Sequence, residues 1–291
     1  DIADYGGVFK ITEGFLERYG AARVRNTPLC ESAILGIGIG LALKGFKSMV
    51  EMQFADFVSC GFNQIVNNAA KLQYRWSQGV DMVIRMPTGA GVGAGPFHSQ
   101  SNEAWFFHTP GLKIVYPSNP YDAKGLLLAS LEDPNPVMYF EHKALYRSLK
   151  AEVPTDYYTV PLGKATIVRP GDQVSIITYG MGVHWATAVA EKMNISAEIL
   201  DLRTLLPLDY EAIQETVKHT GKVLILHEAT LTGGIGAELS AHISEALFEH
   251  LDGPVLRVAG LDTPVPFAAN LEKMFLPQER LEVQLKKLLE Y

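Results

Sequence analysis

The sequence predicts an α/β protein with two open, mainly parallel sheets covered by helices. Short apolar segments alternate with helical segments up to about residue 148, and the alternation restarts after residues 149–162, which show no clear period. Such alternation is typical of parallel sheets with helices on their faces, joined by right-handed crossovers. We therefore expect two domains, over residues 1–150 and 160–291.

Four short apolar segments are expected to form the strands of the first half: Met49–Ala55, Met82–Met86, Leu112–Tyr116 and Val137–Phe140. A helix is expected from Pro120, because Asn119 is a suitable N-cap and proline favours the first helical position. The prolines at 134 and 136 end that helix.

The second half repeats the pattern with four strands: Val174–Tyr179, Ala197–Leu202, Val223–Leu226 and Val255–Val258. Helices are expected at about 183–193, 209–219, 235–250 and 278–290. Glycines at the strand-to-helix turns, as in Gly180-Met181-Gly182 and Gly233-Gly234, fit this reading.

Composition excludes several classes of protein. The net charge of −7 disfavours a nucleic-acid surface. The longest apolar stretch, residues 33–43, is too short for a membrane span and is expected to be a buried helix. Neither Cys30 nor Cys60 has a metal-like spacing, and a reducing compartment is the simplest reading. The first residue is aspartate and no signal peptide is present, so the natural polypeptide is expected to continue upstream.

The glycine-rich segment 89–95 follows a predicted strand and has three interpretations. Dinucleotide binding is disfavoured, because Ala94 stands where the third glycine of GxGxxG is required and no GK[ST] follows. The segment is either a flexible surface turn or a mobile loop that folds over a ligand and delivers His98.

Glu31 and His98 are the candidate catalytic residues, each with a structural alternative. Glu31 precedes an apolar helix, so it either caps that helix or, where desolvated, holds a proton at neutral pH. His98 follows the glycine-rich segment and precedes Ser99-Gln100-Ser101; it is either a structural histidine or a general acid or base. The eight histidines show no zinc-like spacing, and no GxSxG motif occurs.

Several segments, in the right order over essentially the whole chain, resemble beta subunits of the decarboxylating component of 2-oxo acid dehydrogenase complexes, which are transketolase-like and use thiamin diphosphate. The matching segments are Thr27–Glu31, Glu51–Phe57, Phe97–Ser101, Pro110–Lys113, Tyr121–Leu127 and Asp201–Thr204. The resemblance implies a pyrimidine-binding domain at 1–150, lacking its first strand and helix, and a transketolase C-terminal-like domain at 160–291.

The resemblance also implies roles for individual residues. Glu31 matches the glutamate that binds the pyrimidine ring of thiamin diphosphate and promotes the tautomer needed for catalysis. Leu29, Gln53 and Phe57 match the lining of the aminopyrimidine pocket. His98 matches the histidine that orients substrate and acts in acylation of a lipoyl group.

Metal sites follow from the resemblance as well. Ser130, Asp133 and Asn135 match a monovalent-cation (K⁺) site, although the last two also suit a plain proline-bounded turn. The GDG…NN motif that holds diphosphate and Mg²⁺ in this family is missing, so Mg²⁺ ligands are expected on an alpha partner, either a separate subunit or the alpha half of a fused chain.

The expected function is therefore oxidative decarboxylation of a 2-oxo acid with acyl transfer to a lipoyl group. The segments His98–Ser101 and His227–Gly234 favour branched-chain substrates, with pyruvate as the rival. Another transketolase-like enzyme and a non-catalytic scaffold subunit remain as alternatives. A second beta subunit and a lipoyl-bearing acyltransferase core are expected partners, with no nucleic acid and no membrane. The expected location is the cytoplasm in a bacterium or the mitochondrial matrix in a eukaryote.

Overall fold

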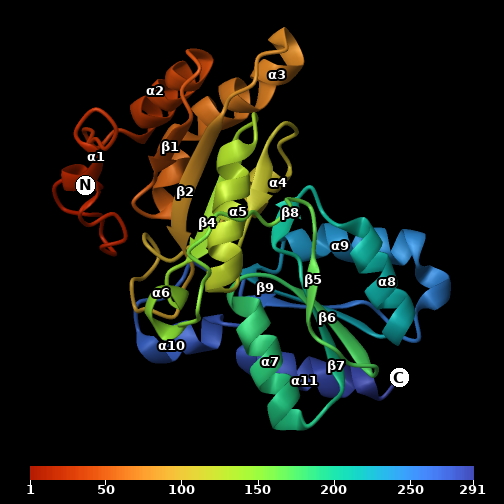
Figure 1. Cartoon of the computed structure of the whole chain (residues 1–291). Coiled ribbons are helices and arrows are strands. Elements are labelled where there is room, and N and C mark those ends of the chain that lie inside the picture. The colour runs from red at the N-terminus through yellow and green to blue at the C-terminus, as the bar shows by residue number, and fades with distance from the viewer.

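The computed structural model describes all residues 1–291, and its two lobes each contain a five-stranded sheet (Figure 1). The first sheet has the order β1-β2-β4-β3-β8 and the second β10-β9-β6-β7-β5. The first contains β1 (Ser48–Glu51), β2 (Met82–Thr88), β3 (Lys113–Val115), β4 (Val137–His142) and β8 (Thr204–Leu206). The second contains β5 (Thr166–Arg169), β6 (Val174–Thr178), β7 (Ala197–Asp201), β9 (Val223–Thr230) and β10 (Leu256–Gly260). These two helix-covered sheets confirm the predicted fold class.

Each sheet is parallel except for one edge strand. β1, β2, β4 and β3 are parallel, and β10, β9, β6 and β7 are parallel, whereas β8 and β5 pair antiparallel at the edges. The sequence analysis did not identify β5 or β8. β8 has only three residues, and β5 is largely exposed, so neither shows the continuous apolar run of a buried parallel strand.

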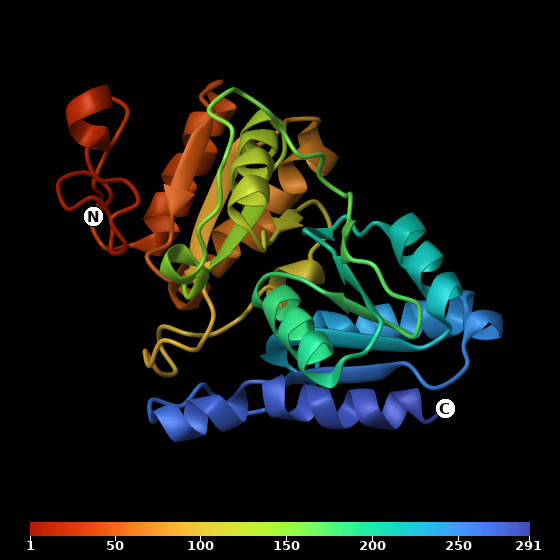
Figure 2. The same ribbon diagram turned by 60° about the horizontal axis from the view of Figure 1, so that its bottom comes forward.

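The helices cover both faces of each sheet (Figures 1 and 2). In the first lobe α2 (Glu31–Leu43) contacts β1 and β2, and α5 (Pro120–Glu132) contacts β2 and β4 on the opposite face. In the second lobe α7 (Met181–Met193) and α11 (Gln278–Leu289) cover one face, and α8 (Tyr210–Thr220) and α9 (Ile235–Ala246) the other. The shorter helices are α1 (Phe15–Tyr19), α3 (Ala70–Trp76), α4 (Ala104–Phe107), α6 (Leu145–Ser148) and α10 (Ala269–Phe275).

The predicted strand Met49–Ala55 is too long. The strand ends at Glu51, and the chain then forms a 3₁₀-helical segment, η1 (Ala55–Gly61), followed by a π-helical turn, η2 (Gln64–Ala69). A second 3₁₀ turn, η3 (Phe248–His250), follows α9 in the second lobe. Ala55 and Val58 are fully buried on the inner side of η1. Helical burial of these two residues replaces the strand periodicity that the apolar composition suggested.

The two sheets share one apolar core. Its largest cluster of 33 buried residues includes Ile84 of β2 and Ile177 of β6, so it crosses from one lobe into the other. The segment expected as a linker is also tied down, since the Val160 N–H donates to the Gly125 carbonyl of α5 (3.1 Å). The lobes are therefore one packed unit. None of the helices combines the length and the apolar character that a membrane span requires.

Candidate functional site

Glu31 begins helix α2 and lies against η1. The preceding residue, Cys30, makes no side-chain cap bond to the helix. Glu31 is the acidic residue of the first turn, a position at which the helix dipole favours negative charge in general. The half-buried Glu31 side chain takes no part in the hydrogen bonds or ion pairs of the chain. A Cβ placed on Gly61 of η1 would lie 3.2 Å from the Glu31 carbonyl oxygen. The structure thus gives Glu31 a free carboxylate beside the segment that carries Phe57.

His98 and Phe57 are brought into contact. The imidazole ring of His98 meets the rings of Phe54 and Phe57 edge-on, with centroids 4.7 and 5.5 Å apart. The backbone N–H of His98 donates to the Gly95 carbonyl (3.3 Å), but its half-buried side chain has no hydrogen-bond partner in the chain. Both ring nitrogens are therefore available to a ligand.

Asp56, next to Phe57, was not identified from the sequence. Its Oδ1 accepts a hydrogen bond from the Gln100 N–H (3.2 Å), while its buried Oδ2 has no partner. Burial raises the pKa of Asp56, and the bond from Gln100 partly offsets this effect. Asp56 therefore joins η1 to the segment that carries His98.

The other two residues predicted for the pyrimidine pocket are placed differently. The Gln53 amide donates to the Asp1 carboxylate (2.9 Å), and the Leu29 side chain is 89% exposed. Within this single chain the structure thus groups Phe57 and His98, with Glu31 on the adjoining helix, whereas Leu29 makes an open apolar surface.

The glycine-rich segment is anchored through its backbone. The Ala90 N–H donates to Glu228 Oε1 (2.6 Å), and the N–H groups of Gly91 and Gly93 donate to the Glu272 carboxylate (2.9 and 3.1 Å). The segment lies beside α10, which carries Glu272 (Figure 2). A backbone nest of this kind suits an anion, and here the anion is a carboxylate of the protein. The segment is therefore anchored, although residues 91–93 are exposed, and the N–H groups that a phosphate would need are occupied. Its movement over a ligand stays a prediction.

A buried polar cluster of Glu228, His142 and Lys143 contacts this segment. Glu228 at the end of β9 accepts a hydrogen bond from His142 Nε2 (2.6 Å), and the Lys143 ammonium contacts the Gly89 carbonyl. Burial alone would raise the pKa of Glu228, but the charge and hydrogen bond of His142 and the Ala90 N–H bring the pKa below its ordinary value. Burial lowers the pKa of Lys143 to about 8, against the opposing effect of the nearby carboxylates.

Sequence reasoning did not assign functions to Glu228, His142 or Lys143. The available signal was polar residues at the ends of two fully apolar strands, Val223–Leu226 and Val137–Phe140. Because the carboxyl ends of parallel strands are where sites form in open α/β sheets, charged residues there are candidates for site chemistry. Which charges meet depends on how the two sheets face each other, and no local pattern contains that information.

The residues predicted for a monovalent cation lie at the other end of the first sheet. The Asp133 carboxylate forms an ion pair with Lys113 and accepts hydrogen bonds from the backbone and side-chain nitrogens of Asn135 (2.9 and 3.3 Å). The Ser130 hydroxyl donates to the Leu126 carbonyl (2.7 Å). The Asp133 carboxylate is thus already paired with an ammonium, and the K⁺ site stays a prediction.

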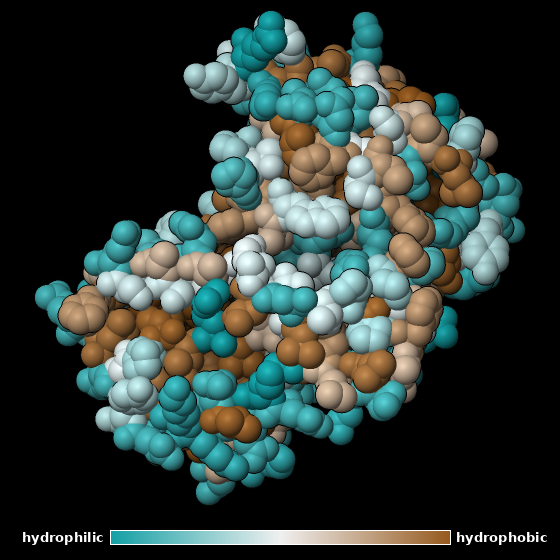
Figure 3. Space-filling view, turned by 180° about the vertical axis from the view of Figure 1, so that it is seen from behind, coloured by the Kyte–Doolittle hydropathy of each residue, from teal (hydrophilic) through white to brown (hydrophobic).

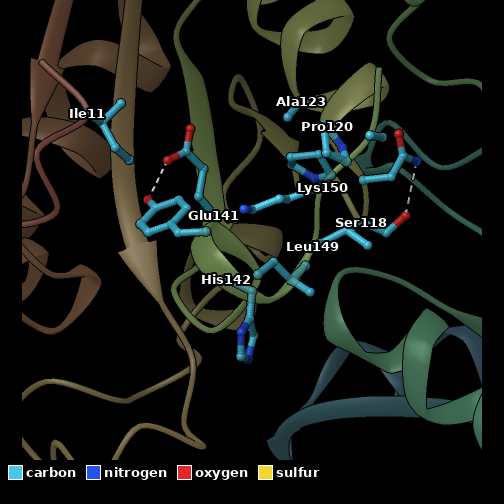
Figure 4. Close-up of a pocket in the computed structure, with 13 residues that line it drawn as sticks. Ile11, Ser118, Pro120, Ala123, Glu141, His142, Leu149 and Lys150 are labelled. Atoms are coloured by element: carbon cyan, nitrogen blue, oxygen red, sulfur yellow. Dashed lines mark hydrogen bonds between the residues drawn. The ribbon is translucent and has the colours of Figure 1, made fainter. Parts of the chain in front are cut away.

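A cavity of about 560 Å³ lies at the carboxyl ends of β3 and β4 and holds none of the predicted residues. The Tyr146 hydroxyl donates to the Glu141 carboxylate at the edge of this cavity. Figure 4 shows His142 pointing away from Glu141, as expected for successive strand residues. The other labelled residues that line it are Ile11, Ser118, Pro120, Ala123, Leu149 and Lys150. The cavity is thus separate from the Phe57–His98 contact.

Comparison with known proteins identifies both halves of the chain. The transketolase pyrimidine-binding domain matches residues 1–148 and the transketolase C-terminal domain matches residues 163–280. Among solved structures, a split-gene transketolase described as an inactive beta4 tetramer has a TM-score of 0.78 over 100% of this chain and 90% of its own, at 22% identity. This similarity supports the fold.

Curated relatives are more similar in sequence. The 2-oxoisovalerate dehydrogenase subunit beta of Bacillus subtilis is 49% identical, covering 100% of this chain and 91% of its own length. The mitochondrial 2-oxoisovalerate dehydrogenase subunit beta of Dictyostelium discoideum is 49% identical (94% and 75% covered), and the pyruvate dehydrogenase E1 component subunit beta of Acholeplasma laidlawii is 42% identical (97% and 88%). The chain therefore belongs to the transketolase-like family of 2-oxo acid dehydrogenase beta subunits.

Proposed function

We propose that this chain is the beta half of a dehydrogenase that decarboxylates branched-chain 2-oxo acids oxidatively and transfers the acyl group to a lipoyl group. The observation that carries the proposal is the similarity over the full chain to 2-oxoisovalerate dehydrogenase beta subunits. The pyruvate dehydrogenase subunit is less similar, so pyruvate is the less supported substrate. We assign cofactor binding to residues 1–150 and subunit contacts to residues 160–291.

The Phe57 ring, the His98 imidazole against it and the Glu31 carboxylate on α2, which packs against η1, fit the pyrimidine ring of thiamin diphosphate, on which this family depends. An aromatic face, a carboxylate and an imidazole, the last two without partners in the chain, suit a flat heterocycle with nitrogen donors and acceptors. When bound, thiamin diphosphate supplies the carbon nucleophile and the electron sink for decarboxylation. No group of three or more His, Cys, Asp or Glu residues is placed to hold a metal, and we assign the Mg²⁺ ligands to the alpha partner.

Glu31 is proposed to hold a proton at the pyrimidine ring nitrogen. Its carboxyl group lies at the N-terminus of α2 and has no partner in the chain, so it is free to bond a ligand. A carboxyl group hydrogen-bonded to a ring nitrogen can donate a proton to it and take the proton back as general acid and base. Phe57 can pack its ring face against the pyrimidine ring. Because phenylalanine has no hydroxyl to bond that ring, we assign the orientation of the ring to Glu31.

His98 is proposed to orient the substrate and to move a proton during acylation of the lipoyl group. Its ring is held by the edges of Phe54 and Phe57, which fixes its plane without using either nitrogen. A histidine so placed can donate a hydrogen bond to a carboxylate of the substrate or exchange a proton with a thiol.

An alpha partner is expected because the site is open on one side. Leu29 beside Glu31 is 89% exposed, Phe97 beside His98 is 68% exposed, and hydrophobic residues break the hydrophilic surface of both lobes (Figure 3). Exposed apolar side chains around a catalytic group favour a site that is completed by another protein surface. We further propose a second beta subunit and a lipoyl-bearing acyltransferase core as partners.

The proposal is tested by reconstituting the chain with an alpha subunit, thiamin diphosphate and Mg²⁺. Dye reduction is followed with 3-methyl-2-oxobutanoate and with pyruvate. Preference for the branched acid supports the proposal, and preference for pyruvate overturns the substrate but keeps the reaction. Bound cofactor without turnover of either acid points to another transketolase-like reaction, and absence of bound cofactor favours a scaffold subunit.

The role of His98 is tested with His98→Ala in the same complex. We expect slower acyl transfer to a lipoyl domain with cofactor binding retained, because the imidazole contacts only aromatic edges in the chain. Acyl transfer at the wild-type rate in this variant contradicts the assignment.

A further inference from the structure

The segment between β2 and α4 has a backbone that glycine alone adopts without strain. Gly89, Gly91, Gly93 and Gly95 have φ angles of 93°, 84°, 70° and 71°, all in the left-handed region. A side chain on Gly89 would collide with the His142 imidazole, and one on Gly95 would collide with the Phe267 ring. The segment is therefore shaped to fit against His142 of the first lobe and Phe267 of the second, and His98 lies three residues after its last glycine.

Two carboxylates of the second lobe take up the backbone N–H groups of this segment. Glu272 on α10 is 5% exposed, and its only hydrogen bonds are those from Gly91 (2.9 Å) and Gly93 (3.1 and 3.3 Å). Hydrogen bonds to an ionised group are about twice as strong as neutral ones. Glu272 thus has one structural task, which is to hold the middle of the segment.

Glu228 joins the two ends of the same segment. Its Oε1 accepts from the Ala90 N–H (2.6 Å) before His98 and from the Ser101 hydroxyl (3.2 Å) after it, and its Oε2 is held by His142 Nε2 (2.6 Å). One buried carboxylate therefore closes the stretch 90–101 into a loop.

The His98 side chain has no hydrogen bond of its own that would fix its position. Its place is set by the Phe54 and Phe57 edges and by the backbone on either side, where the Thr88 hydroxyl donates to the Gln100 carbonyl (2.7 Å). A displacement of the glycine-rich segment is therefore transmitted to the imidazole. Misplacement of a reacting group by about 1 Å can lower a rate by about a hundredfold.

We propose that Glu228 and Glu272 are positioning residues through which the second lobe holds the glycine-rich segment and so places His98 for acyl transfer. This proposal rests on the role given to His98 above. Neither carboxylate touches the reacting groups; each acts through the backbone of residues 90–101.

The test compares Glu272→Ala and Glu272→Gln in the reconstituted complex, with Glu279→Gln as the matched control. Glu279 lies on α11, is 65% exposed at its side chain and pairs only with Lys273. Two readouts are taken: amide hydrogen exchange of residues 89–101, and single-turnover acyl transfer to a lipoyl domain alongside dye reduction. Thermal unfolding of each variant checks that the fold is retained.

For Glu272→Ala we expect exchange in residues 89–101 to rise roughly ten- to a hundredfold, as loss of charged hydrogen bonds implies. Acyl transfer is expected to slow by roughly ten- to a hundredfold, with little change in the KM for the 2-oxo acid. Glu272→Gln keeps one carbonyl oxygen for the Gly91 N–H and is expected to recover part of both effects, while Glu279→Gln is expected to match the wild type.

Unchanged exchange in Glu272→Ala refutes the tether, and raised exchange with wild-type acyl transfer refutes the positioning role. His98→Ala separates this proposal from the one on which it rests. A loss in His98→Ala without a loss in Glu272→Ala refutes the positioning proposal alone. If His98→Ala itself transfers at the wild-type rate, the role of His98 is wrong and the positioning role falls with it.

Discussion

Glu103 gives the sharpest test of the buried electrostatics beside the proposed site. It follows the segment that carries His98, is 1% exposed, and accepts a hydrogen bond from the Tyr179 hydroxyl at Oε1 (2.6 Å), while Oε2 has no partner. Burial raises the pKa of Glu103 from 4.5 to about 7, opposed by the Tyr179 bond and reinforced by Glu228. Near neutral pH the folded protein therefore holds a proton here that the unfolded chain releases.

The direction of the pH dependence follows from this difference. Because the pKa is higher in the folded protein, the free energy of unfolding decreases as the pH rises from about 4.5 to about 7 and is constant above that range for this group. A pKa displaced from 4.5 to about 7 corresponds to about 3 kcal/mol, since each tenfold change in proton affinity corresponds to about 1.4 kcal/mol. Glu103→Gln replaces the protonated acid with a neutral group of similar size and removes this cost.

The assay is urea denaturation of wild type and Glu103→Gln at pH 5 and pH 8. We expect the variant to gain about 2.5 kcal/mol relative to the wild type between these two pH values, because part of the effect is already present at pH 5. In Tyr179→Phe, loss of the hydroxyl donor should raise the pKa of Glu103, so the decrease in the free energy of unfolding should extend to higher pH than in the wild type. A difference between wild type and Glu103→Gln that is the same at both pH values refutes the reasoning.

Three further predictions concern the site and its support. Glu31→Gln is expected to lower turnover in the complex by at least roughly a hundredfold with unchanged thermal unfolding, because its carboxylate has no partner in the chain; near-normal turnover contradicts its role. Gly89→Ala should destabilise the chain by more than about 2 kcal/mol, because the new side chain is strained at a left-handed position and collides with His142. Gly93→Ala meets no atom within 4 Å and should cost only about 1 kcal/mol. Equal thermal midpoints of the two variants would rule out the collision. Glu228→Ala should lower the free energy of unfolding by about 3–5 kcal/mol, or the thermal midpoint by roughly 10 °C. Because the pKa of Glu228 lies below 4.5 in the folded protein, the stability difference from wild type should be full above that pH and smaller below it. A stability difference that does not depend on pH would be evidence against this charge.

Much of the fold follows from local patterns. The apolar runs at 82–86 and 174–179 are fully buried parallel strands, and the Asn119 side chain caps α5 by accepting from the Asp122 N–H (2.9 Å), as predicted. The residues between Met52 and Ala55 were assigned wrongly, because a short apolar run does not distinguish a strand from a buried helical turn. β8 was missed because a three-residue edge strand has too few positions to show a period.

The candidate site, too, contains residues that the sequence identifies and contacts that depend on the tertiary structure. Glu31, Phe57 and His98 were identified from segments that resemble a family, and the contact between Phe57 and His98 agrees with a shared site. The roles of Glu31 and His98 in the reaction stay predictions. The cation site expected at Asp133 also stays a prediction; the structure pairs Asp133 with Lys113, twenty residues earlier. Lys113 begins a neighbouring strand, so its approach depends on sheet order.

By itself the sequence determined the two α/β halves, the family and the segments that carry the candidate catalytic groups. The tertiary structure alone decided that the glycine-rich segment binds carboxylates of its own chain, through Ala90 to Glu228 and through Gly91 to Glu272, 138 and 181 residues apart. Periods of 2 and 3.6 residues are local properties that a sequence displays directly. Which carboxylate meets which backbone N–H depends on how two sheets pack across a shared core, and that is a property of the whole chain.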